Sequence, residues 1–537
     1  MTLPQQLQQQ GRCQVVRSDW SIAWGALTNW LAFLATLLTS FFLAPYLLER
    51  LGPSRYGVWC IVEAVLAYFT LFDLGIAACL VRYVARYHTL ADLPLLNRYA
   101  ASAFWLYSLL ALVVLAISIP LSYKVATPLE QRLDTTDRVT PFMLLLLIQF
   151  AAGLPLSVFP TLLDGLQLFG WKSLVRLFAL AGRISGIVLV MEMQPGLLGL
   201  ALVLSITQLA EHLLMFVVVR WQLPGLSLSW HWLDRAALRE IRHYSRDAFV
   251  AMVAGRLSGQ SGPLLAGWLL SPMAAATYAL ASRLIDMGKN LLRSATTTLA
   301  PAISQREAIA DHHGLHQLFV GATRTVLYLV LPIHLGIVFF GRPFLLRWLG
   351  SDELACQCYP LAVILSLTLT LGVAQSVAAR ILYGLGQLRT FSRLALLEGV
   401  VVLGTGYVLV QLGGLPGLAL AVAGPNVLFC LWTITAACRW THTRLADYGR
   451  RGCLRPLLVA TVPLLIWWSL TPVLPQWTSL LLTAALGLIP YAALVLVVED
   501  AIRQLVCDRV RRGLQRLLVK SSPPQQSPGL ATEPLRR

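Results

Sequence analysis

Charged residues are scarce in this sequence. Asp, Glu, Lys and Arg make up 12% of its 537 residues, whereas 57% are hydrophobic. Soluble domains contain about 25% charged residues, and one soluble core cannot bury so much apolar surface. The scarcity excludes a soluble globular protein and leaves little material for long polar loops. We therefore expect an all-α integral membrane protein whose main solvent is lipid.

Other signals are also missing. The first twenty residues lack the basic start, short apolar core and cleavage site of a signal peptide, so we expect the first apolar segment to remain as a transmembrane helix. The nine cysteines show no CxxC or zinc-type spacing. His312, His313 and His316 lie in a predicted loop without further metal ligands. We expect no metal and no cofactor.

Acidic residues are fewer than basic ones, and the formal net charge is +17. The Lys and Arg residues are not gathered into one domain, as nucleic-acid binding requires. They alternate with apolar runs, which is the distribution that the positive-inside rule describes. We expect no nucleic-acid partner.

About fourteen apolar segments are long enough to cross a membrane. They lie at approximately 22–47, 56–80, 99–123, 141–163, 173–191, 196–219, 247–270, 274–300, 319–340, 357–383, 394–411, 416–438, 456–474 and 478–498. The loops on one side carry most of the arginines, so the rule predicts that both termini are cytoplasmic.

The chain also repeats part of its pattern. Gly165 and Trp221 recur as Gly384 and Trp440 with identical spacing, which is typical of transporters built from two related halves. The expected organisation is a polar cytoplasmic N-terminus (1–20), an N-lobe of spans 1 to 6 (21–220), a cytoplasmic amphipathic linker (221–246), a C-lobe of spans 7 to 12 (247–440), two additional spans (441–499) and a basic cytoplasmic tail (500–537).

Ionisable residues inside spans are costly and are therefore candidates for function. Most of them here are cations, and we expect them to surround a cavity that receives an anionic group, because guanidinium makes paired, charge-assisted bonds to phosphate. The candidates for substrate binding are Arg256, Arg283, Lys289, Arg293, Arg176 and Arg183. The alternative for any one of them is pairing with a carboxylate or reaching to the lipid headgroups.

Two acidic residues are candidates for ion coupling, Asp73 and Asp286. Asp73 precedes Gly75, so it also suits a structural role as a cap where a helix bends. No pair of acids or activated nucleophile marks a catalytic site in the longest expected external loops, 124–140 and 341–356. We do not expect an enzyme.

Several segments resemble a known family. The sequences LGPSRYGVW at 51–59, FDLG at 72–75 and RYVARY at 82–87 are similar to those of polysaccharide exporters and O-antigen or lipopolysaccharide flippases of the multidrug/oligosaccharidyl-lipid/polysaccharide superfamily. Tyr278, Pro301, Gln305, Gly384 and Gln387 in the second half also fit.

This resemblance implies two six-helix lobes in a V around a central cavity, here with two further C-terminal helices, in the cytoplasmic (inner) membrane of a bacterium. It implies alternating-access translocation of a polyprenyl-diphosphate-linked oligosaccharide for cell-surface polysaccharide synthesis, with cavity cations holding the diphosphate. Membrane lipid and glycan-assembly membrane proteins are the implied partners. The alternatives are a cation-coupled drug antiporter of the same fold, a membrane glycosyltransferase or polymerase, and a scaffold in a glycan-assembly complex.

Overall fold

The structure is a computed structural model that describes residues 19–499, except 132–137, 194–195, 297–302, 304–305, 307–308, 310, 386 and 471–476. The described part is helical and contains no β-strand. The predicted polar N-terminus lies almost wholly outside the described residues, and the predicted basic tail lies entirely outside them.

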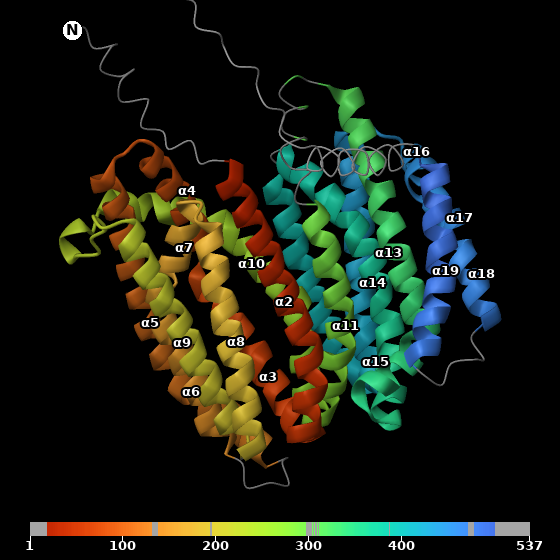
Figure 1. Cartoon of the computed structure of the whole chain (residues 1–537), viewed down its shortest axis with the longest axis horizontal. Coiled ribbons are helices and arrows are strands. Elements are labelled where there is room, and N and C mark those ends of the chain that lie inside the picture. Colours follow the sequence, from red (N-terminus) through yellow and green to blue (C-terminus); the bar gives the residue numbers. More distant parts are fainter. Residues whose placement is uncertain are drawn as a thin grey trace, which may run out of the picture.

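The helices follow one another along the chain (Figure 1). The first half contains α2 (Asp19–Leu51), α3 (Pro53–Phe69), η2 (Thr70–Asp73), α4 (Ile76–Thr89), α5 (Leu93–Glu130), α6 (Val139–Leu156), α7 (Val158–Gly165), α8 (Phe169–Met193), α9 (Leu197–Gln222) and η3 (Trp230–Trp232). The second half contains α10 (Arg235–Leu269), α11 (Pro272–Thr296), α13 (His312–Leu349), α14 (Asp352–Gly384), α15 (Leu388–Trp440), α16 (Leu445–Asp447), η4 (Tyr448–Leu454), α17 (Arg455–Val459), α18 (Thr461–Leu470) and α19 (Trp477–Val498).

In their described residues, the fourteen predicted spans lie largely on helix. Within the described residues, 11 helices are long and apolar enough to cross a membrane. The two numbers differ because α15 holds two predicted spans, separated at Gly414, where φ is 56°, and because α10 and α11 are too polar to be recognised by hydropathy alone. Polar spans are typical of helices that face an internal cavity.

Large apolar side chains cover the outside of the bundle. Leu412, Trp468 and Phe178 are 78%, 73% and 72% exposed, and many leucines are more than half exposed. Exposed apolar patches of this size are unusual on soluble monomers, but they match hydrocarbon. The chain is therefore a multi-pass membrane protein.

Much of the described part of the two longest external loops expected from the sequence is helix. Helix α5 continues to Glu130, and α13 continues to Leu349, one residue before the left-handed Gly350 that ends it. Hydropathy cannot distinguish a polar loop from a polar helix end, because it carries no information on backbone conformation. The three histidines expected in a loop likewise begin α13 or lie in its first turns.

Two bundles lie side by side (Figure 1). In the first, α5 packs on α6, α6 on α9, and α8 on both α9 and α2. In the second, α10, α11, α13, α14 and α15 pack together, and η4, α17 and α19 lie against α13. The bundles meet chiefly where α3 contacts α10 and α11.

The same local structures occur in both bundles, 219 residues apart. Helices α5 and α13 both contain 38 residues, and each begins after an aspartate whose side chain accepts a backbone N–H three residues later, Asp92 from Leu95 and Asp311 from Gly314. Gly165 packs against Val84, and Gly384 packs against Ile303, which is likewise 219 residues after Val84. The sequence repeat thus corresponds to repeated structure.

We expect equivalent losses from removing the two caps. An N-cap aspartate replaced by alanine typically costs about 1 kcal/mol, so Asp92→Ala and Asp311→Ala should each lower the thermal unfolding midpoint by a similar, modest amount. Tryptophan fluorescence on detergent-solubilised protein measures this shift. A large loss from one variant and none from the other would contradict their structural equivalence.

The predicted linker helix is not a separate element. Helix α10 begins after the cap residue Asp234 and continues without a break to Leu269, so the linker's helical part and span 7 form one helix of 35 residues. Its first turns contact the first bundle, where the Tyr99 hydroxyl donates to the Glu240 carboxylate. Tyr83 stacks on Tyr99 with ring centroids 4.4 Å apart.

Hydrogen bonds from Tyr99 and Tyr83 hold the pKa of the Glu240 carboxyl below its ordinary value of 4.5. A lowered pKa means that the ionised form contributes stability above pH 4.5, and that this contribution is lost as the pH falls through the lowered value. The native protein should therefore unfold at a higher temperature than Glu240→Gln at pH 7, and the difference should shrink as the pH falls below 4.5. A constant difference over this range would exclude the Glu240 carboxylate as its cause.

Candidate functional site

A cavity of 390 Å³ lies between the two bundles, within the range of typical ligand pockets. Residues from α2, α3, α10 and α11 line it. Its polar lining residues are Thr36, Ser40, Cys60, Glu63, Gln260, Ser282, Arg283, Asp286 and Asn290. The α11 members recur every three or four residues, so one face of this helix forms one wall.

Arg283 is the cation of this cavity. Its guanidinium donates to the Tyr56 hydroxyl at 3.2 Å and lies 3.5 Å from the Glu63 carboxylate. The Arg283 side chain is 23% exposed and that of Glu63 is 50% exposed. An ion pair this long and this accessible to solvent is weak, so another anion in the cavity can compete for the guanidinium.

The bundles close on one another at one end of the cavity. A Cβ atom on Gly57 would lie 1.7 Å from the backbone oxygen of Pro272, so only glycine permits the approach of α3 to α11. Nearby, the indole N–H of Trp348 donates to the Phe41 carbonyl at 3.0 Å, and the two rings stack. This end is the one that the charge distribution predicts to be external.

Three other predicted cations lie on α10 and α11. Arg256 precedes the lining residues Gln260 and Pro263 by four and seven positions, so it shares their helix face without lining the cavity. Arg293 is in α11, but its side chain lies outside the described residues.

Lys289 also belongs to α11 but does not line the cavity. It interacts electrostatically with Glu398, which is 7% exposed and accepts hydrogen bonds from Ser258 at 2.8 Å and from Asn426 at 3.0 Å. Lys289 therefore belongs to a second polar cluster, inside the C-terminal bundle between α10, α11 and α15.

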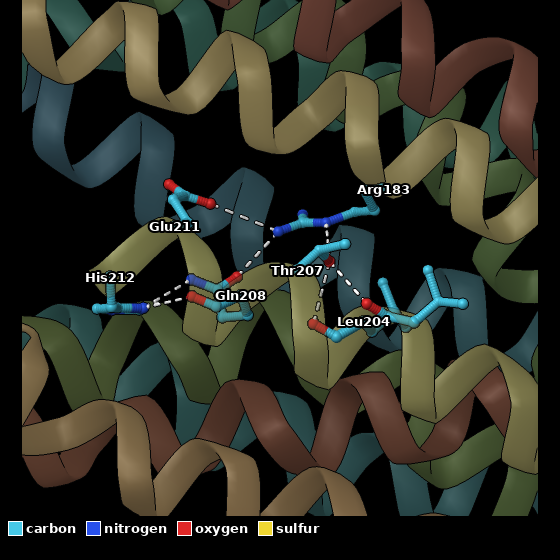
Figure 2. Close-up of polar contacts among 7 residues, drawn as sticks. Arg183, Leu204, Thr207, Gln208, Glu211 and His212 are labelled. Carbon is cyan, nitrogen blue, oxygen red and sulfur yellow. Dashed lines mark hydrogen bonds and ion pairs between the residues drawn. The ribbon is translucent and has the colours of Figure 1, made fainter. Parts of the chain in front are cut away.

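The two arginines of α8 are not brought into the cavity. Arg183 lies 3.5 Å from the Glu211 carboxylate and donates to Gln208 at 3.0 Å, both on α9, and Figure 2 shows this network inside the first bundle. His212 continues it through Gln208. Arg176, also on α8, is exposed.

Of the two predicted coupling residues, Asp286 lines the cavity and Asp73 does not. Asp73 ends η2, just before the left-handed Leu74 and Gly75, and its carboxylate accepts the Tyr107 hydroxyl and the Ala77 backbone N–H. This is the cap geometry that its position before Gly75 indicated. A coupling role for Asp73 stays a prediction.

The charge of the cavity differs from the expectation. We predicted an excess of cations, but the described lining residues include one arginine and two carboxylates, Glu63 and Asp286. Spacing along α11 shows which of its residues share a helix face, but it does not show which residues of α3 lie opposite them. Tyr56 and Glu63, the direct partners of Arg283, were therefore not predicted as site residues.

Solved structures share this architecture at low sequence identity. The lipid II flippase MurJ in an inward closed conformation superposes with a TM-score of 0.68 at 13% identity, covering 88% of this chain and 99% of that one. An inward-facing MATE-family multidrug resistance transporter of the MOP superfamily gives a TM-score of 0.64 at 14% identity, covering 75% of this chain and 94% of that one. A MOP-superfamily transporter from Pyrococcus furiosus, described as having a binding pocket of reversed polarity, gives 0.58 at 13% identity, covering 80% and 96%. The chain thus has the MOP-superfamily transporter fold.

No curated protein matches the sequence. The family model described as "Polysaccharide biosynthesis protein" matches residues 22–307, more than half of the chain. The protein belongs to this polysaccharide biosynthesis family, in agreement with the resemblance carried by its N-terminal motifs.

Proposed function

We propose that the protein translocates a polyprenyl-diphosphate-linked oligosaccharide across the cytoplasmic membrane for cell-surface polysaccharide synthesis. The observation that carries the proposal is Arg283 at the cavity between the bundles, in a chain of the polysaccharide biosynthesis family. A guanidinium in a partly desolvated cavity binds phosphate oxygens with paired, charge-assisted hydrogen bonds.

Glu63 acts as the counter-ion of Arg283 when the cavity is empty. Its carboxylate lies at 3.5 Å and is half exposed, so a diphosphate carrying more than one negative charge competes successfully for the guanidinium. The oligosaccharide would occupy the cavity beside it, and the polyprenyl chain would stay in lipid. Rocking of the two bundles about their contact would then expose the headgroup on the other side.

A cation-coupled antiporter is the second candidate, and the two carboxylates Glu63 and Asp286 in the same cavity favour it. Arg283 argues against a cationic substrate, because the guanidinium would repel it. Asp286 is then better placed than Asp73 to carry a coupling proton, because it lines the cavity.

The orientation and surroundings are part of the same proposal. We place both termini in the cytoplasm, because the arginine-rich loops alternate with arginine-poor ones. The lipid-linked oligosaccharide, membrane lipid and glycan-assembly membrane proteins are the proposed partners, and no enzymatic step is assigned to the chain.

Leaflet exchange tests this function. Purified protein in liposomes should move a fluorescent polyprenyl-diphosphate oligosaccharide between leaflets faster than protein-free vesicles do, and should leave a cationic dye in place. Efflux of the dye without exchange of the lipid would transfer the assignment to the antiporter.

A further inference from the structure

A second cavity, of 640 Å³, lies between the start of α10 and the first bundle. Leu74, Ile76 and Leu106 line it from the first bundle. Leu238, Ile241 and Phe249 line it from α10. This predominantly apolar cavity is separate from the central one, because no residue lines both.

Three arginines border the cavity on the same helix. Arg235, Arg239 and Arg242 are spaced by four and three residues, so they fall within about 60° of the α10 circumference. All three are exposed, and none forms an ion pair with a residue that the structure describes. Glu240, the nearest carboxylate within α10, lies at least about 100° around the helix from each of these arginines and accepts a hydrogen bond from the Tyr99 hydroxyl.

A buried polar atom also faces this space. Ser245 lines the cavity and is 5% exposed, and its hydroxyl has no hydrogen-bond partner in the described part of the chain. Buried hydroxyls are nearly always satisfied. An unpartnered one within a lined cavity therefore indicates a ligand that accepts or donates a hydrogen bond there.

The depth of the cavity in the membrane follows from helix length. The 35 residues of α10 extend about 52 Å at 1.5 Å per residue, whereas the hydrocarbon core is about 30 Å thick. The apolar part of the helix occupies the core, so its basic first turns lie at the level of the headgroups. Phosphates of the bilayer are found at this depth.

We propose that this cavity binds an anionic phospholipid of the cytoplasmic leaflet. An acyl chain would occupy the apolar space between Leu106 and Phe249. An ester oxygen of the lipid would accept a hydrogen bond from the Ser245 hydroxyl. The phosphate would lie on the arginine face of α10. Because α10 belongs to the second bundle and Leu74, Ile76 and Leu106 to the first, the lipid holds the two bundles together at this end. The site does not depend on what the central cavity transports.

Native mass spectrometry of the full-length protein tests the site. Delipidated protein is titrated with dioleoyl phosphatidylglycerol, with dioleoyl phosphatidylcholine, and with a polyprenyl phosphate. Each Lys or Arg near a membrane surface strengthens the binding of anionic lipid. The loss of two such cations weakens this binding about thirtyfold. We therefore expect the Arg239→Gln/Arg242→Gln variant to bind phosphatidylglycerol with a dissociation constant about thirtyfold higher than that of the native protein.

Two matched variants complete the design. Arg450→Gln/Arg451→Gln removes the same charge from exposed residues far from this cavity along the chain and should bind phosphatidylglycerol as the native protein does. Ser245→Phe keeps every arginine, fills the apolar space and should also lose the lipid. The proposal would be overturned if the native protein bound phosphatidylcholine as tightly as phosphatidylglycerol, or the polyprenyl phosphate more tightly. It would also be overturned if Arg239→Gln/Arg242→Gln bound phosphatidylglycerol as tightly as the native protein does.

Discussion

Arg283→Gln should reduce the exchange of a lipid-linked diphosphate between leaflets by roughly ten- to a hundredfold. A hydrogen bond from a charged group contributes about 1.5 to 3 kcal/mol, and Arg283 is the only cation among the described residues that line the central cavity. Glutamine retains most of the volume and removes the charge. The exchange rate of fluorescent substrate in proteoliposomes measures the loss directly.

Two further variants show whether the effect belongs to the guanidinium. Arg283→Lys keeps the charge but not the planar fork, so its rate should lie between those of the native protein and the glutamine variant. Arg342→Gln removes an exposed arginine that is paired with Asp352 outside the cavity, and it should exchange substrate at the native rate. Equal losses from Arg283→Gln and Arg342→Gln would point to general charge rather than to the cavity.

Gly57→Ala should open the contact between the bundles at the predicted external end. The added Cβ would meet the Pro272 carbonyl at 1.7 Å, and backbone cannot turn aside as a flexible side chain can. Over-packing of this kind costs roughly 1 to 3 kcal/mol, which the molecule avoids by separating α3 from α11. Cys60, which lines the cavity one turn further along α3 and is 4% exposed, should then react with a thiol reagent roughly ten- to a hundredfold faster.

Gly182→Ala is the matched control, because nothing lies within 4 Å of the position that its Cβ would take. Peptide mapping after labelling separates Cys60 from the exposed Cys356. If Cys60 reacted equally slowly in Gly57→Ala and Gly182→Ala, the close approach at Pro272 would not be what holds the bundles together.

Most of the spans were predictable from length and hydropathy, whereas the polar helices α10 and α11 do not stand out by hydropathy alone. The break within α15 was also predictable, since Gly413 and Gly414 separate two apolar runs and Gly414 adopts a positive φ. The continuation of α5 and α13 beyond the membrane was not, because their ends are polar and resemble loops. The repeat of Gly165 as Gly384 was visible in the sequence, whereas their equivalent packing against Val84 and Ile303 was seen only in the structure.

The site was only partly predictable. Arg283, Asp286 and Asn290 line the cavity together because their spacing along α11 places them on one helix face. Spacing within one helix does not reveal which other helix approaches it. Glu63 and Tyr56 come from α3, more than 200 residues away, and Lys289 interacts electrostatically with Glu398 on α15 and does not line the cavity.

The affinity of the purified protein for a short-chain prenyl diphosphate tests the central claim most directly, with Arg283→Gln and Glu63→Gln measured beside the native protein. We predict that Arg283→Gln binds at least about tenfold more weakly, and that Glu63→Gln binds as tightly as the native protein or more tightly, because it loses the carboxylate that competes for the guanidinium. The reverse pattern, with undiminished binding by Arg283→Gln and none by Glu63→Gln, would contradict a phosphate site at Arg283.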